Sequence, residues 1–432
     1  MSESRVLERL FEFMKGNVIV LTITQSMGMF CRSMVFPYAS LFIIALGGES
    51  AQIGFINSLR PLAGLLMFPI AGHLSDVGGR VKLIAVASFL SGVSYLMYVL
   101  APTWEWIALG SLVQGFMVFQ FPPTSAILAD SLDPENRGMG IATMNTISSL
   151  LALFSPYIAG IALSIYGNEF GMRLLYSALA SVYMISGLIH IKFLRETADN
   201  PVDEFSLSEV PDMFSEAFGG IPDLLGNLPL TVKALAVIMT LGFTSNAVGS
   251  PFWVVYVTDV INLSSLEWGL ILLVESGLRT LLYIPAGVIV DRYGRARSLS
   301  ASLFLSLIAV PLLVFSDSFF EVLMIRSAIG ISNAIMVPAS SALLADAVPR
   351  DIRGRAMAAI GRGSMLLGAT GGGTGGPGMG YIITLPVVVM SIVGGYIYAL
   401  NPSFTWGLIT FTIFLSLVTS LIFVRDPKEA ER

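Results

Sequence analysis

The amino-acid sequence predicts an all-helical, polytopic membrane protein with twelve transmembrane helices in two parallel six-helix bundles related by pseudo-twofold symmetry. Three observations lead to this prediction. The 432-residue chain is 55% hydrophobic and only 12% charged, too few charges to cover the surface of a soluble domain. Its apolar runs repeatedly reach the ~20 residues that a spanning helix needs. Its second half repeats motifs of its first half.

The apolar runs are bounded by Gly, Pro and clusters of charge, which mark the ends of spans. The first six predicted spans lie at 17–46, 51–75, 82–101, 105–130, 138–166 and 172–194. The second six lie at 231–259, 265–290, 298–316, 319–346, within 354–399, and at 404–424. We therefore expect an N-terminal bundle at 1–195, a cytoplasmic linker at 196–230 and a C-terminal bundle at 231–432.

The linker and the loops predict the orientation. In the acidic linker, Val210, Phe214 and Phe218 follow helical spacing, which predicts a short amphipathic helix on the membrane surface. If the spans alternate, nearly all Lys and Arg residues in the loops fall on one side, and only Arg173 falls in a loop on the other. The positive-inside rule then places both termini in the cytoplasm and the protein in the inner (cytoplasmic) membrane.

Three matches between the halves establish the internal repeat. Residues 72–80 (GHLSDVGGR) match 287–295 (GVIVDRYGR), 215 positions later. Residues 125–130 (SAILAD) match 341–346 (SALLAD), 216 positions later. Gly28, Arg32 and Pro37 match Gly242, Asn246 and Pro251, 214 positions later. Because each half holds an even number of spans, the halves insert with the same topology, and substrate sites of such repeats lie at their interface near the midplane.

The repeated Gly-x-x-x-Asp-(Arg)-x-Gly-Arg loop resembles the signature loop of the major facilitator superfamily, and its recurrence after the eighth span is also typical of that family. The resemblance covers essentially the whole chain. It implies two six-helix bundles around a central cavity, alternating access and secondary transport. In the first copy, Val77 stands where the pattern prefers a basic residue, so we expect its charge network to be weaker.

Charged residues of these loops are candidates for a cytoplasmic gate. A carboxylate at a helix end can cap a neighbouring helix or pair with a guanidinium across the bundle interface, and such contacts exist in only one of two arrangements. The alternative is that the charges only set topology and solvate the loops. The candidates are Gly72, Asp76, Gly79, Arg80, Asp130 and Arg137 in the first half, and Gly287, Asp291, Arg292, Gly294, Arg295, Asp346 and Arg353 in the second.

Ionisable residues inside the spans are costly and are functional candidates by default. They are Arg32, Arg60, Glu275, Arg279 and Arg326, with Gln114 and Asn246 as further polar candidates for binding substrate or coupling protons. Arg60 and Glu275 each precede the motif glycine by 12 residues and therefore lie at equivalent depths.

Two interpretations of Glu275 compete. Glu275 and Arg279 are spaced i,i+4 and can simply neutralise each other. Alternatively, the excess of arginines makes a positive cavity for an anionic substrate, and protonation of Glu275 frees Arg279 to bind that anion. Arg326, nearer the outer end of its span, fits an external gate as well as a substrate contact.

Arg326 and Gly330 resemble the Arg-x-x-x-Gly signature of such transporters, including proton-driven drug antiporters. The equivalent stretch of the first half is Ser111–Gly115, with serine where drug antiporters usually carry arginine. This departure weakens assignment to the drug-export branch.

The second half carries 14 extra residues between Gly354 and Pro386, coinciding with the glycine-rich run 368–380, which cannot hold a regular helix. At membrane depth this run would be a broken helix that needs partners for its backbone. Alternatively, 355–367 is an interfacial helix and the run is a cytoplasmic loop or hinge, which we favour.

Taken together, these features favour a proton-coupled secondary transporter of a small organic solute, with export slightly preferred. The alternatives are uptake or exchange of an anionic metabolite, and a non-coupled sensor or lipid-translocating protein of the same fold. No nucleophile–base pair, cofactor motif or metal-ligand cluster indicates an enzyme. We expect a monomer whose partners are its substrate, protons and the lipid bilayer, without nucleic acid.

Overall fold

The computed structural model describes residues 14–77, 79–198, 207–349, 352–361, 363–370 and 379–426. In this part of the chain nearly all regular structure is helical, and the single β contact is an isolated bridge between Gly361 and Met379. Twelve helices are long and apolar enough to cross a membrane. The predicted all-helical, twelve-span architecture is therefore confirmed, and the chain is a multi-pass membrane protein.

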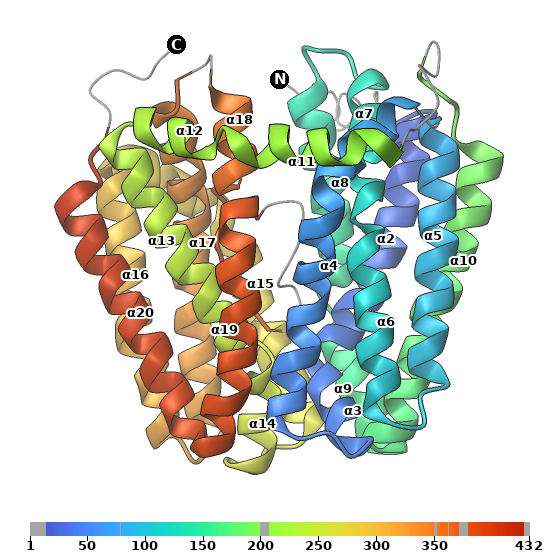
Figure 1. Ribbon diagram of the computed structural model, residues 1–432. Coiled ribbons are helices and arrows are strands. Elements are labelled where there is room, and N and C mark those ends of the chain that lie inside the picture. The colour runs from blue at the N-terminus through green and yellow to red at the C-terminus, as the bar shows by residue number, and fades with distance from the viewer. Residues whose placement is uncertain are drawn as a thin grey trace, which may run out of the picture.

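The first six spans form the N-terminal bundle (Figure 1). Prolines explain why several spans consist of two consecutive helices, since proline lacks the N–H that continues a helix and favours helix starts. Pro37 lies in a 3-10 turn of the first span, and Pro156 starts the second half of the fifth. The elements are α2 (Asn17–Val35), η1 (Phe36–Tyr38), α3 (Ala39–Ala45), α4 (Ser50–Val77), α5 (Arg80–Val99), α6 (Trp104–Phe116), η2 (Met117–Gln120), α7 (Phe121–Asp130), α8 (Arg137–Ala152), α9 (Ser155–Tyr166) and α10 (Asn168–Phe193).

The last six spans form the C-terminal bundle in the same manner, except that the eleventh is not one continuous helix. Its helical parts are α18 and α19. The elements are α13 (Leu230–Gly249), α14 (Phe252–Asp259), α15 (Ser265–Tyr293), α16 (Arg295–Leu312), η4 (Leu313–Phe315), α17 (Phe319–Ala347), α18 (Arg353–Ile360), α19 (Tyr381–Leu400) and α20 (Pro402–Phe423).

Short helices of the linker cross one end of the molecule. They are η3 (Leu207–Glu209), α11 (Val210–Gly219) and α12 (Ile221–Asn227). Figure 1 shows α11 and α12 running from the N-terminal bundle to the C-terminal bundle, and α11 packs against α4 while α12 packs against α18. We call this end the terminal face, because the first and last described residues lie there, and the opposite end the distal face.

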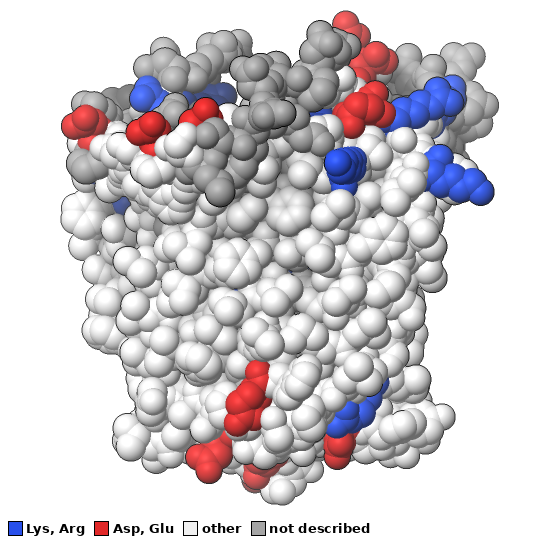
Figure 2. Space-filling model, turned by 45° about the vertical axis from the view of Figure 1, so that its right-hand side comes forward, with Lys and Arg blue, Asp and Glu red and all other residues white. Residues whose placement is uncertain are grey.

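A belt of uncharged surface separates the two faces. In the view of Figure 2, charged side chains gather at both ends and are missing from the broad zone between them. Large apolar side chains are exposed on the spans, including Ile284 (82%) and Leu281 (75%). In water this exposure would be unfavourable, whereas against lipid tails it costs nothing.

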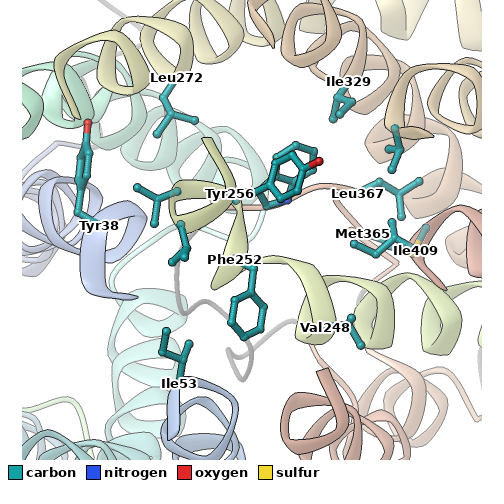
Figure 3. Packing of buried hydrophobic residues seen from close by; sticks show 14 of the residues in the cluster. Tyr38, Ile53, Val248, Phe252, Tyr256, Leu272, Ile329, Met365, Leu367 and Ile409 are labelled. Atoms are coloured by element: carbon teal, nitrogen blue, oxygen red, sulfur yellow. The ribbon is translucent and has the colours of Figure 1, made fainter. Parts of the chain in front are cut away.

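The two bundles touch at their distal halves. α4 packs against α19 and α9 against α15. At both contacts the two backbones approach each other closely. A Cβ on Gly54 would lie 2.5 Å from the Ser391 carbonyl oxygen, and a Cβ on Gly160 would lie 2.6 Å from the Ser265 carbonyl oxygen. One buried apolar cluster crosses the boundary, with Tyr38 and Ile53 from the N-terminal bundle beside Phe252 from the other (Figure 3).

Toward the terminal face the bundles separate. α8 buries only the stripe Gly140, Met144, Ser148 and Ala152. The terminal half of α15 buries only Ala286 and Val290, and exposes apolar residues on its other sides. Each helix is therefore held to its own bundle along a single stripe. In the described part of the chain, the close contacts between the bundles therefore lie at the distal face.

Candidate functional site

A buried ion pair lies inside the C-terminal bundle, between α15 and α17. Arg326 Nε and Nη2 donate to the same Glu275 carboxylate oxygen, at 2.8 and 2.5 Å. Arg326 is 1% exposed and Glu275 is 4% exposed. Among the ion pairs formed within the described residues, this is the one with both partners fully buried.

The rest of the Arg326 guanidinium is also occupied. Its Nη1 donates to the Gly368 carbonyl at 2.8 Å. Its carbon lies 4.4 Å from the ring centre of Trp253 and 5.6 Å from that of Trp268, within the range of cation–π attraction. Arg326 is thus held by a carboxylate, a backbone carbonyl and two indoles.

The expected pairing of Glu275 with Arg279 is wrong. Although the two share one helix face, the carboxylate binds Arg326 on another helix. Arg279 is partly exposed and makes no hydrogen bond or ion pair with the described residues. The expectation failed because i,i+4 spacing only reports neighbours on one helix, while the inter-helix packing brings Arg326 closer.

Residues 363–370 enter the C-terminal bundle as non-helical chain. Met365 and Leu367 are 0% and 1% exposed. Asn333 binds both backbone groups of Leu367, donating to its carbonyl at 2.8 Å and accepting from its N–H at 2.9 Å. Asn246 donates to the Leu366 carbonyl and accepts from the Ala369 N–H. We call residues 363–370 the inserted segment.

The inserted segment corrects two expectations. The proposed interfacial helix at 355–367 ends at Ile360. The start of the glycine run, at 368–370, is half-buried and belongs to a broken part of the eleventh span, not to a cytoplasmic loop. Its backbone groups find partners on α13 and α17, as non-helical chain at membrane depth requires. Residues 371–378 lie outside the described part of the chain. Asn246 was predicted as a candidate, but Asn333 was missed.

The N-terminal bundle holds a small cavity at the position of Arg60. It has a volume of about 60 Å³ and is lined by Phe36, Ala39, Ile43, Ile56, Asn57, Arg60, Tyr95, Tyr98, Ile107, Ser111, Gln114 and Tyr176. The Arg60 guanidinium lies 5.6 Å from the Phe36 ring centre. Gln114 points its amide at α5, donating to the Ser91 carbonyl at 3.1 Å and to the Ser94 hydroxyl.

Arg32 belongs to a neighbouring aromatic network. Its Nη1 donates to the Tyr183 hydroxyl at 2.6 Å. The Tyr183 ring lies 5.4 Å from Tyr95, which in turn lies 6.3 Å from Tyr176. Sequence reasoning missed these tyrosines because all three come from α5 and α10, which are spans without charge at membrane depth.

At the terminal face, the repeated motifs form matching contacts within each bundle. Arg80 pairs with Asp130 at 2.5 Å in one bundle, and Arg295 pairs with Asp346 in the other. Arg137 and Arg353, the other arginine candidates next to these acids in the sequence, donate to the carbonyls of Ala129 and Val348.

Two acids missed by the sequence reasoning cap the helices that follow the motifs. Glu196 accepts from the Val81 N–H at 3.0 Å, and Asp426 accepts from the Arg295 and Ala296 N–H groups at 3.0 Å each. A carboxylate stabilises a helix N-terminus in this way. The two acids lie 230 positions apart, the same offset that relates Pro156 to Pro386, so that offset could have found them.

The remaining motif residues shape the turn. Gly79 and Gly294 have φ of +74° and +94°, which other residues rarely adopt, whereas Gly72 and Gly287 have open space around their Cα atoms. Asp291 is exposed and lies 3.9 Å from Arg295, and Arg292 lies over the Tyr293 ring. The second motif borders a surface depression of about 470 Å³. The side chain of Asp76 lies outside the described residues.

The motif contacts seen here lie within bundles and do not cross between them. No group of three His, Cys, Asp or Glu side chains in the described part of the chain is placed to hold a metal ion. The charged groups available are therefore the buried Glu275–Arg326 pair, further arginines within the spans and two sets of charged contacts at the terminal face.

This combination of fold and site is that of a membrane transporter, and comparison with known proteins gives its family. The model of the Major Facilitator Superfamily matches residues 21–246 and 234–432. The chain belongs to this superfamily and is a transporter, not an enzyme.

Relatives and solved structures agree with this assignment. The chain is 24% identical to the multi-drug resistance efflux pump PmrA of Streptococcus pneumoniae over 324 residues, 74% of this chain and 78% of the relative. It is 25% identical to the multidrug resistance protein MdtG of Enterobacter lignolyticus over 333 residues, 75% and 76% of the two chains. The nucleoside transporter NupG has the same fold, with a TM-score of 0.67 at 14% identity over 95% and 98% of the two chains. The human organic anion transporter MFSD10 shares it with a TM-score of 0.57 at 16% identity over 93% and 98%.

Proposed function

We propose that this protein exports a small organic solute across the cytoplasmic membrane in exchange for protons, by alternating access. The observation that carries the proposal is the Glu275–Arg326 pair, a carboxylate buried at membrane depth against a single guanidinium. Ionisable groups at such depth are kept for function far more often than for stability.

The pair supplies a proton switch. When Glu275 is ionised, it neutralises Arg326, as in the structure. When Glu275 takes up a proton, its attraction for the guanidinium falls and Arg326 must be stabilised by other partners. The charge of the site therefore changes by one unit with each proton bound. In an antiporter open toward the side from which substrate enters, Glu275 is expected to have lost its proton.

The orientation of the chain and the names of its relatives support export as the direction of transport. The basic residues of the loops are concentrated at the terminal face, and the positive-inside rule makes that face cytoplasmic. In the proposed cycle, the arrangement with the bundles in contact at the distal face is the one open toward the terminal face. Of the relatives, PmrA is named as an efflux pump and MdtG as a multidrug resistance protein. Both termini and the linker are then cytoplasmic, and drug-like solutes enter from the inside.

The moving parts are the two bundles, 1–195 and 231–432, joined by the linker 196–230. We propose that one chain is the working unit, because each bundle already contributes its own half of the interface. The motif contacts Arg80–Asp130 and Arg295–Asp346 keep the terminal ends of each bundle rigid, and their exposed partner Asp291 is free to reach the other bundle when that face closes.

A second candidate is exchange of an anionic metabolite. It is favoured by Arg60 and Arg279, which make no ion pair with an acid of the described chain. In that case Glu275 is only the structural partner of Arg326, and protons are not moved.

Internal pH of proteoliposomes separates the two candidates. Anionic, neutral and cationic compounds are added to vesicles holding the parent protein, Glu275→Gln or Glu267→Gln. Glu267 lies on the same helix but at its exposed N-terminus, in a capping box with Ser264 that glutamine also satisfies.

Proton-coupled export predicts compound-dependent proton flux in the parent and in Glu267→Gln, and none in Glu275→Gln. Exchange of labelled anions at equal rates in all three proteins, without proton flux, would overturn the proposal and favour the second candidate.

A further inference from the structure

The two bundles can be compared residue by residue around Glu275. Gly330 touches the backbone of Glu275, since a Cβ added there would lie 3.0 Å from the Glu275 carbonyl oxygen. Gly115, 215 positions earlier, touches the backbone of Arg60 in the same way. Arg60 also lies 215 positions before Glu275. Arg60 is therefore the structural counterpart of Glu275.

The same offset relates the partners. Arg326, which neutralises Glu275, corresponds to Ser111. Ser111 and Arg60 both line the 60 Å³ cavity of the N-terminal bundle. The C-terminal bundle thus has a complete ion pair at these positions, whereas the N-terminal bundle has Arg60, the small hydroxyl of Ser111 in place of a charged partner, and a cavity that both residues line.

No side chain among the described residues supplies the missing negative charge. None of the residues that line the cavity is acidic, and Arg60 makes no hydrogen bond or ion pair with a carboxylate in the described chain. A guanidinium at membrane depth without a counter-ion is costly. The aromatic ring of Phe36 at 5.6 Å offsets only part of that cost.

The cavity has the size and lining for one anionic group. Because a water molecule needs ~10–15 Å³ of such space, about 60 Å³ holds a carboxylate but not a whole drug-sized molecule. Asn57 and Ser111 line it beside Arg60, and Tyr95, Tyr98 and Tyr176 supply aromatic walls. Arg–carboxylate contacts are strong and directional, and aromatic walls favour an aromatic body.

We propose that this cavity binds the carboxylate of an aromatic organic acid, which completes at Arg60 the ion pair that Glu275 and Arg326 form in the other bundle. The inference deepens the proposed function by naming a substrate class, and rests on it only in calling the bound acid a substrate. Binding itself requires neither a gradient nor transport.

Equilibrium binding of labelled benzoate to the purified protein in nanodiscs tests the site. Arg60→Gln removes the cation. Ser111→Glu places a carboxylate beside Arg60 at the position of Arg326, so that the chain supplies its own counter-ion. Arg355→Gln, which removes an exposed arginine of α18 far from the site, is the control. Unlabelled benzamide, acetate and chloride are used as competitors.

The expected result is saturable benzoate binding in the parent and in Arg355→Gln, and at least a tenfold loss of affinity in Arg60→Gln and Ser111→Glu. Benzoate should compete at least tenfold better than neutral benzamide, and better than acetate, which lacks the ring. Gel filtration shows whether each variant is folded. If Arg60→Gln does not fold, the affinity of Ser111→Glu for benzoate decides the test.

Equal benzoate affinity in the parent and in folded Arg60→Gln or Ser111→Glu would overturn the inference. Displacement of benzoate by chloride at equal concentration would also overturn it, because that result indicates a site for an inorganic anion. If benzoate binds as expected but no compound drives proton flux, the site stands and the proposed antiport fails. If proton flux is found but Arg60→Gln binds benzoate normally, the antiport stands and this site fails.

Discussion

Glu275 and Arg326 form a pair whose two members depend on each other. Taking both charges out of water costs several kcal/mol per ion, which their attraction and the contacts of Arg326 with Gly368 and two indoles must offset. Such a pair adds little net stability, but loss of one member leaves a buried charge alone. Because stability alone gives little reason for such a pair, its presence at membrane depth is the basis on which we propose that Glu275 binds protons.

A double-mutant cycle tests this dependence. Arg326→Gln should destabilise the protein by about 3–5 kcal/mol, because the Glu275 carboxylate is left without its counter-ion. Adding Glu275→Gln should restore much of that loss. Equilibrium unfolding of the purified variants measures both effects. Glu169→Gln, which breaks an exposed pair with Arg173, should cost less than about 1 kcal/mol, and additive losses in the Glu275–Arg326 cycle would contradict the idea.

The inserted segment replaces part of a helix in the eleventh span. α17 supports it along its length: Ser340 binds the Gly363 carbonyl, Asn333 binds Leu367, and Arg326 binds Gly368. These three positions of α17 cover ~21 Å at 1.5 Å per residue. Five residues of extended chain span at most about 17 Å, so the segment runs nearly straight from the terminal side toward the ion pair.

Because Arg326 binds both Glu275 and Gly368, the proposed proton site and the inserted segment share one side chain. Protonation of Glu275 should therefore change how firmly the end of the segment is held. The single cysteine, Cys31, makes the segment accessible to a labelling experiment after Cys31→Ser.

A cysteine at Leu367 should react slowly with a water-soluble maleimide, because this position is 1% exposed. Adding Asn333→Ala removes two hydrogen bonds to the backbone of residue 367. The N–H and carbonyl groups left without a partner each destabilise the buried segment by about 1–3 kcal/mol. Labelling should then become at least several-fold faster. A cysteine at Arg355, exposed on α18, should react quickly in both backgrounds. Equal slow rates at Leu367 would show that Asn333 does not hold the segment.

Sequence reasoning succeeded where structure depends on order along the chain. The offset of 215–216 residues gave two bundles, the equivalent depths of Arg60 and Glu275, and the matching motif arginines. It failed where contacts join distant helices, as for Glu275 with Arg326 and for Tyr183 with Arg32. It also missed the path of residues 363–370, because glycine content indicates that a helix breaks without indicating whether the broken chain stays outside or enters the bundle.

For the molecule as a whole, the distal interface depends on small residues. Gly54 of α4 meets Gly395 of α19, and Gly160 of α9 lies against the start of α15. Backbones approach closely at such positions because no side chain intervenes. The interface can therefore close tightly and yet hold few interlocked side chains that would resist opening.

Gly395→Ala should shift the protein away from the distally closed arrangement. The added Cβ would lie 2.7 Å from the Ser50 carbonyl oxygen, and overpacking of this kind costs about 1–3 kcal/mol. That is a roughly 5- to 150-fold change in the ratio of the two states, measurable as longer distances between spin labels on the distal ends of the two bundles. As a control, Gly407→Ala on α20, which has open space around it, should leave the distances unchanged. Unchanged distances in Gly395→Ala as well would show that this contact does not limit closure.

Tyr38 sits at this boundary with one proton and two acceptors. Its hydroxyl lies 2.8 Å from the Pro156 carbonyl of its own bundle and 3.1 Å from the Ser265 carbonyl of the other. A phenol can donate only one hydrogen, so the second acceptor is surplus. When the bundles part, Tyr38 keeps the nearer acceptor, and the Ser265 carbonyl remains within the first turn of α15. The two bundles can therefore separate here without leaving a buried donor unpaired, which makes this contact readily reversible through repeated cycles.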